Sequence, residues 1–295
     1  MKALSTKSNF LGIAEKNLYS YDKSKYVIQP VPYEYTSSYL AGSDKGPQAI
    51  INASQFVELY DEELDMETYR KCGIATLPAL KFGKNIVDAK AVALIEKSTD
   101  KLLSDGKYVV SLGAEHTVTY GFVKSFAKKY KNLTVLQIDA HSDLRQSYHN
   151  NIYSHASVMK RVHDMGINLV QVGIRAQCIE EAMLIKSSKN INTFYSHTVR
   201  NDAKWMDKAV AACTENVYLT IDADGFDPSI MPAVGTAEPR GLFWEETLQF
   251  LKQVIKKKNV VGFDIVECAP MKGTILSEYT LAKLAYRLIG YLESK

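Results

Sequence analysis

The chain has few of the features that mark secreted proteins. Its 295 residues include only four cysteines, Cys72, Cys178, Cys213 and Cys268, which lie far apart and form no C-x-x-C pair. This usage is typical of a reduced cytoplasmic protein and argues against a disulfide framework. The four thiols are therefore expected to be small, buried, apolar side chains.

Long apolar runs and a strong charge imbalance are also absent. No run approaches the roughly eighteen apolar residues of a membrane span, and the first residues, MKALSTKSNFLGIAEKN, lack the continuous apolar region of a signal peptide. The formal net charge is +3 and charged residues make up 23% of the chain, which does not indicate a nucleic-acid or membrane surface. We expect a cytoplasmic protein with no nucleic-acid or membrane partner.

What the sequence does contain is a regular alternation of apolar runs and helical patterns. Eight short runs rich in β-branched and apolar residues predict strands, over residues 26–31, 73–77, 108–112, 133–139, 169–174, 191–195, 217–221 and 260–266. Continuous apolar strands separated by helices favour an α/β fold in which a parallel sheet is covered on both faces. Periodicity alone does not distinguish an open sheet from a closed barrel.

The helical patterns between these runs are spread along the whole chain. They predict helices over residues 48–60, 85–104, 117–130, 180–186, 202–213, 244–256 and 278–292. No repeat, low-complexity tract or linker divides the sequence, so residues 1–295 are expected to form a single domain, with residues 1–25 as an N-terminal arm. A loop over residues 33–46, rich in Tyr, Ser and Gly, has a length that is often functional in a compact domain.

The end of the predicted strand 133–139 carries three residues of metal-ligand type. Asp139, His141 and Asp143 follow one another at two-residue spacing in the segment LQIDAHSDL. Because side chains alternate across an extended chain, this spacing places two carboxylates and an imidazole on one face. Such a set suits Mn, Zn, Fe or Co. Taken alone, the same residues could also be strand-end caps or surface groups.

Two other strand ends carry groups of the same kind. Asp222 and Asp224 end an apolar run in VYLTIDAD, and His116 follows the run that ends in Gly113. Sites in open α/β sheets lie at the carboxyl ends of the strands, so these residues and the first three are expected to converge. Six ligands exceed the three usual for a catalytic zinc and fit a two-metal site with bridging carboxylates. Singly, Asp143 could cap a helix and His116 could be a hydrogen-bonded core histidine.

Six segments, in order along the chain, resemble motifs of the ureohydrolase family of arginases and agmatinases. They are GAEHTVTYG, IDAHSDLR, YSHASVM, TIDADGFDPS, GTAEPRGL and FDIVECAP. The DAHSD and DADGFDP pair is highly specific to this family. The resemblance runs from about Tyr33 to the C-terminus. Within the family, the segments are most similar to those of bacterial and archaeal agmatinases. The resemblance implies a three-layer α/β/α arginase-like fold around an eight-stranded parallel sheet, and assembly into trimers or hexamers.

The resemblance also implies the ligands of two Mn²⁺ ions per chain. The first ion would be held by His116, Asp139, Asp143 and Asp222. The second would be held by Asp139, His141, Asp222 and Asp224, so that Asp139 and Asp222 bridge. A water shared by two cations becomes acidic enough to supply hydroxide near neutral pH, and its attack on a guanidinium carbon would release urea and an amine.

Three side chains are candidates for work on the substrate. His155, in YSHASVM, is the candidate general acid or proton shuttle for the leaving amine, because an imidazole exchanges protons near pH 7; otherwise it is a loop histidine without a role. Glu267, after the predicted strand 260–266, is expected to pair with the guanidinium through both oxygens, or else to cap the following turn. Asp143 is assigned to catalysis as well as to metal binding. Asp227 is expected to shape a turn with Pro228.

Three of the motifs depart from the family patterns. The common GGDH is GAEH here, which places Ala114 and Glu115 before His116. The loop histidine is followed by Ala156 where many relatives have glycine, and Arg240 replaces one glycine of the GTPEPGGL pattern. None of these changes removes a ligand, so an active enzyme is expected.

The substrate tail is the least determined feature. Arg145 stands where arginases carry an asparagine that helps bind the α-amino-acid group; it could neutralise a carboxylate or brace the loop. The DLR and YSHASVM segments favour agmatine, giving putrescine for polyamine biosynthesis, or an aminopropyl-agmatine. Guanidinobutyrate and arginine are competing substrates. Tyr and Glu side chains of residues 33–39 could line the tail pocket.

Two hypotheses of a different class can be compared with this one. A non-catalytic homologue would bind metal or act as a partner subunit, and a deacetylase of related fold would use one zinc and fewer carboxylates. The presence of all six ligand positions argues against both. Metal content separates the classes, because about two Mn per chain is expected of a ureohydrolase.

Overall fold

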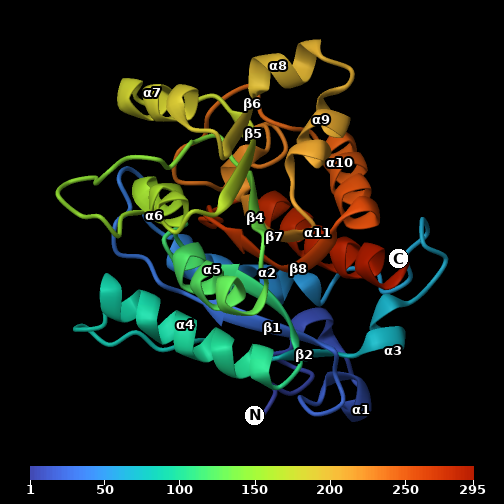
Figure 1. The fold of residues 1–295 in the computed structure, drawn as a ribbon. Helices are drawn as coiled ribbons and strands as arrows, with labels where there is room; N and C mark the ends of the chain where they lie inside the picture. The colour runs from blue at the N-terminus through green and yellow to red at the C-terminus, as the bar shows by residue number, and fades with distance from the viewer.

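The computed structural model describes residues 1–295 and contains one sheet of eight parallel strands (Figure 1). The strand order is β2-β1-β3-β8-β7-β4-β5-β6, so the sheet is open, with β2 and β6 at its edges. The strands are β1 (Tyr26–Val31), β2 (Ile74–Thr76), β3 (Tyr108–Gly113), β4 (Leu133–Ile138), β5 (Asn168–Ile174), β6 (Ile191–Tyr195), β7 (Asn216–Asp222) and β8 (Asn259–Val266). All eight predicted strands are confirmed, with small shifts at their ends.

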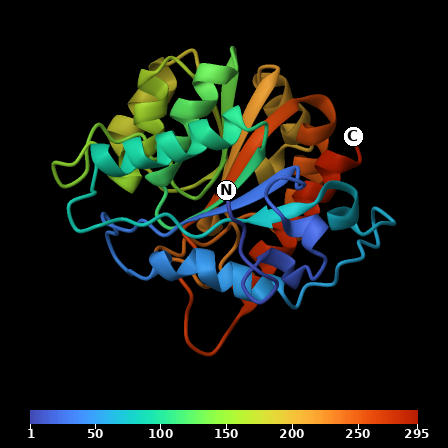
Figure 2. The ribbon, with the colours of Figure 1, turned by 90° about the horizontal axis from the view of Figure 1, so that it is seen from below.

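Helices cover both faces of the sheet, which confirms the predicted three layers (Figure 2). One face carries α4 (Ala89–Ser104), α5 (Val118–Lys129), α6 (Val158–Asp164) and α7 (Ile179–Ser187). The other carries α2 (Gly46–Ser54), α3 (Thr68–Cys72), α8 (Ser196–Asn201), α9 (Trp205–Ala212), α10 (Trp244–Lys257) and α11 (Leu276–Glu293). The short α1 (Lys16–Tyr19) lies near β2. No helix combines the length and the apolar composition needed to cross a membrane.

Each face of the sheet has its own apolar core. The larger core contains 47 buried residues and the smaller contains 27. In β4, Val135 belongs to the smaller core and its neighbour Leu136 to the larger, as alternation along a strand requires. The sequence of such a strand reads as a continuous apolar run because both of its faces are buried.

The helix predicted over residues 48–60 is shorter than expected and ends at Ser54. Phe56 fits the helical spacing but is 79% exposed, and its N–H donates to Ala53 O in a tight turn. Ser54 Oγ donates to Ile51 O and accepts from the N–H of Leu11 at 2.8 Å, so the N-terminal segment docks where the helix would otherwise continue. In that segment Phe10, Leu11 and Ile13 are buried in the larger core.

Candidate metal centre and active site

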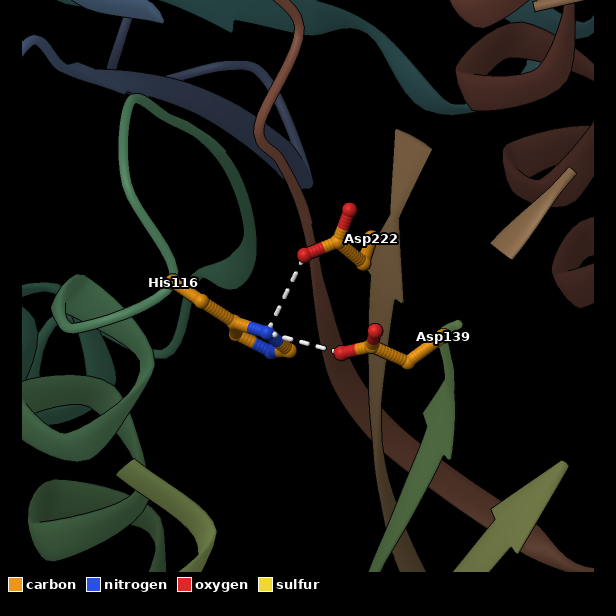
Figure 3. Close-up of side chains that lie close together, drawn as sticks. All are labelled: His116, Asp139 and Asp222. Atoms are coloured by element: carbon orange, nitrogen blue, oxygen red, sulfur yellow. Dashed lines mark ion pairs between the residues drawn. The ribbon is translucent and has the colours of Figure 1, made fainter. Parts of the chain in front are cut away.

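The candidate ligands lie at the carboxyl edge of the four central strands, β3, β8, β7 and β4. Asp139 follows the last residue of β4, Asp222 is the last residue of β7, and His116 lies in the turn between β3 and α5. Because neighbouring strands are parallel, these ends meet at one edge. Figure 3 shows the side chains of His116, Asp139 and Asp222 pointing toward one another from three different segments.

His116 lies at the centre of a first group of buried carboxylates. Its Nδ1 atom is 3.0 Å from Asp139 Oδ2, 3.0 Å from Asp143 Oδ2 and 3.2 Å from Asp222 Oδ2. This nitrogen is buried and makes no hydrogen bond, whereas Nε2 lies 2.9 Å from Thr220 Oγ1. Three carboxylates around one unpaired imidazole nitrogen form the donor set of a divalent cation site.

A second group shares one carboxylate with the first. His141 Nδ1 lies 3.0 Å from Asp224 Oδ2 and 3.7 Å from Asp139 Oδ1. Asp139 thus belongs to both clusters of potential ligand atoms, and the atoms of each cluster lie within 4.8 Å of one another. Asp222 belongs to the first cluster only, so its role as a second bridge stays a prediction.

The electrostatics of the cluster also fit bound cations. Burial, with Asp139 nearby, raises the pKa of Asp143 to about 7. Burial, with Asp224 and Asp139 nearby, raises the pKa of Asp222 well above its usual value. Burial opposes ionisation of Asp139 too, but the two imidazoles hold its pKa below the usual value. Crowded, desolvated carboxylates repel one another, and a cation between them would relieve that repulsion.

One cavity of about 390 Å³, including its open mouth, joins the two groups. It is lined by five of the six candidate ligands, together with His155 and Glu267. The 33–46 loop also lines it, through Ser37, Ser38, Tyr39 and Leu40. Of the Tyr and Glu residues expected there, Tyr39 lines the cavity. Glu34 does not, because its carboxylate accepts bonds within the loop, from Ser37 Oγ and the N–H of Gly42.

His155 enters the cavity from the first residue of a short 3₁₀ turn, His155–Ser157. Burial, together with the nearby imidazoles of His141 and His116, lowers its pKa to about 4. The ring is therefore neutral at pH 7 and has one nitrogen that can accept a proton. The structure brings His155 to the predicted place, and its catalytic role stays a prediction.

Glu267 lies at the predicted place in the cavity, and its role toward the guanidinium stays a prediction. It lines the cavity, and its Oε1 accepts a hydrogen bond from the backbone N–H of His116 at 2.6 Å. The turn that it braces is the one after β3, and not the turn that follows Glu267 itself. Its backbone is in the left-handed region at φ 62°, and its N–H donates to Ala114 O. Burial and the nearby Glu115 raise the pKa of the Glu267 carboxyl.

The comparison with known families agrees with this geometry. The family model described as "Arginase family" matches residues 24–290. The chain belongs to the arginase family. It is 41% identical over 277 residues to the N(1)-aminopropylagmatine ureohydrolase of Synechocystis sp., covering 92% of this chain and 90% of that protein. It is 33% identical to the agmatinase of Pyrococcus horikoshii, covering 90% and 91%.

Solved structures show the same architecture. The agmatine ureohydrolase of Thermoplasma volcanium has a TM-score of 0.84 and 30% identity, covering 95% of this chain and 93% of that one. The proclavaminate amidino hydrolase of Streptomyces clavuligerus has a TM-score of 0.83 at 20% identity, a likeness of fold alone. The resemblance to arginases and agmatinases that the sequence motifs indicate is thus confirmed for the family and for its fold.

Sequence reasoning missed three residues that support the candidate ligands of this arginase-family chain. They are Gln137, Thr220 and Asp264. Gln137 Nε2 donates to Asp139 Oδ2 at 2.7 Å. Thr220 Oγ1 contacts His116 Nε2 and donates to Asp264 Oδ1 at 2.6 Å. Such partners fix the orientation of metal ligands. Gln137 and Thr220 each stand two residues before a ligand on the same strand face, so the two-residue spacing could have found them.

Arg175, just after β5, links two loops next to the candidate metal ligands. Its guanidinium donates to the backbone carbonyls of Asp224 at 2.6 Å and Glu238 at 2.9 Å. Asp227 shapes the turn after β7 as predicted, since its carboxylate accepts from the N–H groups of Ser229 at 3.1 Å and Gly241 at 3.0 Å. No sequence pattern points to the role of Arg175, because its acceptors lie on remote segments.

His149, His163 and His197 are not among the residues that line the cavity. His163 Nε2 pairs with Asn190 Oδ1, and the ring of His197 stacks on Tyr195. These three histidines are suitable for control substitutions.

We predict that Gly241→Ala destabilises the chain. A Cβ at this position would lie 2.3 Å from the backbone carbon of Phe226 and 2.4 Å from the nitrogen of Asp227, where only backbone can move. Overpacking of this kind costs about 1–3 kcal/mol. The thermal unfolding midpoint should fall by several degrees, whereas in Gly83→Ala, whose nearest neighbour is Ile86 Cδ1 at 4.0 Å, it should hardly change. Equal midpoints for the two variants would contradict the prediction.

Proposed function

We propose that this chain is a binuclear manganese hydrolase that cleaves agmatine to urea and putrescine. The observation that carries the proposal is the single cavity in which five of the six candidate ligands meet His155 and Glu267. The chain's membership of the arginase family supports a ureohydrolase. Assembly into a homo-oligomer, a trimer or hexamer, is part of the same proposal.

The two ions would be held by the ligands that the motifs indicate. His116, Asp139, Asp143 and Asp222 would bind one, and Asp139, His141, Asp222 and Asp224 the other. When bound, such ions supply hydroxide from water near neutral pH and stabilise developing negative charge. The unpaired Nδ1 of His116 and the crowded carboxylates support this assignment.

The remaining groups would position the substrate and move protons. Glu267 has one oxygen bonded to the His116 N–H and the other free to pair with the guanidinium, which orients the central carbon toward the metal ligands. A single Glu267 oxygen would then pair with the guanidinium, whereas the sequence led us to expect pairing through both oxygens. His155, neutral at pH 7, would take a proton at its free nitrogen and pass it to the departing amine.

The charge of the cavity lining supports a substrate without an α-carboxylate. No lysine or arginine is among the lining residues. Arg145 is not part of this lining: its guanidinium carbon lies 5.2 Å from the centre of the Tyr148 ring, and its backbone N–H donates to Ala156 O. The packing of its guanidinium on Tyr148 supports the second of its two possible roles, bracing the loop. A carboxylate at the tail of a bound substrate would therefore find no lysine or arginine partner in this cavity.

A second candidate substrate is N(1)-aminopropylagmatine, the compound in the name of the Synechocystis relative. Two of the residues that line the cavity are exposed, Tyr39 at 75% and Leu40 at 55%. A longer polyamine tail could pass between them into solvent while its guanidinium stayed near Glu267. The two candidates share the reacting group and differ only in the tail.

We predict that Mn-loaded protein releases urea from agmatine or aminopropylagmatine far faster than from arginine. An unpaired polar group costs roughly 1–3 kcal/mol and a charged group more, so kcat/KM for arginine should be lower by about 10- to 100-fold or more. Urea release from a panel of guanidino compounds, with guanidinobutyrate included, measures this directly. Faster turnover of arginine would exclude the agmatinase assignment and leave the ureohydrolase assignment intact.

A further inference from the structure

Glu115 connects the metal-binding turn to the 33–46 loop that lines the cavity. It stands next to His116, is 1% exposed, and extends into the 33–46 loop. Its Oε2 accepts hydrogen bonds from the backbone N–H groups of Tyr35 at 2.9 Å and Thr36 at 2.7 Å. Since a backbone N–H can only donate, Oε2 is fixed as an acceptor by these two contacts.

The Thr36 hydroxyl is the next link in this chain of contacts. Its oxygen lies 3.1 Å from Glu115 Oε2. The hydroxyl has a single proton, and we assign it to the contact with Oε2, because a carboxylate oxygen is a stronger acceptor than an imidazole nitrogen. The Thr36 oxygen is then left with its lone pairs, and one of them accepts from the backbone N–H of His155 at 3.1 Å.

His155 Nδ1 lies 3.0 Å from the same Thr36 oxygen. The proton of this contact must come from the ring, because the hydroxyl proton is already engaged with Glu115. A neutral imidazole carries one proton, so a protonated Nδ1 leaves Nε2 with a free lone pair. The order of donors and acceptors thus determines which tautomer of His155 is present.

We propose that Glu115 and Thr36 are positioning residues that hold His155 as its Nδ1–H tautomer, with Nε2 as the nitrogen that exchanges protons in the cavity. The assignment of proton exchange rests on the proposed function, whereas the tautomer follows from the hydrogen bonds alone. Thr36 lies 119 residues before His155 in the sequence, so only the fold brings the two together. Glu115 stands where the family pattern has Asp, and its side chain is one methylene longer.

The test removes the hydroxyl while keeping the shape of the side chain, in Thr36→Val. Thr36→Ser restores the hydroxyl. Thr99→Val is the matched control, because Thr99 is 1% exposed and donates to Ile95 O within α4, away from the cavity. All variants are prepared as full chains, loaded with Mn²⁺ for urea release and with diamagnetic Zn²⁺ for spectra of ¹⁵N-labelled histidine. The His155 signals are assigned by their absence in His155→Asn.

We predict that the wild type, Thr36→Ser and Thr99→Val show the Nδ1–H pattern of His155, and that Thr36→Val loses this preference. In Thr36→Val, kcat should fall about 10- to 100-fold, the usual effect of losing a supporting hydrogen bond at such a site, while KM changes little. If Thr36→Val fails to fold, Thr36→Ala is measured in its place.

Two results overturn the inference: an Nε2–H pattern in the wild type, or an unchanged pattern in folded Thr36→Val. A structural anchor alone would lower the unfolding temperature of the variant without changing the tautomer. A wild type that releases no urea from any guanidino compound would refute the proposed function, and the histidine spectra would still decide the tautomer.

Discussion

Replacing Asp139 with alanine is expected to abolish urea release and to remove bound manganese at the same time. Asp139 is the one carboxylate that belongs to both clusters of ligand atoms, so its loss opens both proposed metal positions. Bound metal contributes several kcal/mol to lowering the reaction barrier, and the expected loss in kcat is on the order of 10³-fold or more. Metal content per chain and urea release, measured on the same preparation, check both parts of the prediction.

The control for Asp139→Ala is Asp100→Ala, on the exposed surface of α4. Asp100 pairs with Lys128 at 2.7 Å, and such a surface ion pair contributes little to stability. This variant should keep about two Mn per chain and full activity. Full activity in Asp139→Ala would refute the two-metal site, and one tightly held zinc in the wild type would refute the ureohydrolase chemistry.

The second large effect is expected for His155→Asn, in which kcat should fall about 10²- to 10⁴-fold, the range for loss of a general acid or base. Metal content should stay unchanged, because His155 belongs to neither cluster of ligand atoms. Burial and the neighbouring imidazoles lower the pKa of His155 to about 4. His155 thus stays neutral as the pH rises from about 6 to 8. The ratio of the wild-type kcat to the kcat of His155→Asn should therefore be constant over that range.

His149→Asn is the matched control for His155→Asn. His149 is exposed, lies in the same loop and is absent from the cavity wall. Its backbone has φ 49°, a conformation that asparagine tolerates well, so the substitution should not strain the loop. A loss of metal in His155→Asn would indicate a ligand in place of a proton carrier. A loss of activity in both variants would indicate an effect of the loop as a whole.

The strands could be predicted from sequence because their signal is local. A strand buried on both faces, such as β4, requires an apolar side chain at almost every position, and the run is visible without any knowledge of its neighbours. The end of α2 could not be predicted in this way. It is set by a bond between Ser54 and Leu11, which are 43 residues apart in the sequence.

The same distinction applies to the candidate site. Asp139, His141 and Asp143 could be predicted as ligands because side chains two residues apart on an extended strand end lie on the same face. Thr36 and Arg175 act through partners on remote segments, and neither stands in a pattern that indicates a role. For Glu267, the motif predicts its place in the cavity but not the bond of one oxygen to His116 N–H.

The position of β8 in the sheet has a consequence for biosynthesis. This strand (Asn259–Val266) lies between β3 and β7, although it is the last of the eight to leave the ribosome. His116 and Asp222 therefore cannot take up their final positions on a nascent chain until residue 266 has emerged. Loading of the proposed metal site would then follow assembly of the complete sheet, and ions bound there would stabilise the whole fold against global unfolding more than any single segment. A truncated chain that ends before β8 should retain no paired metal site.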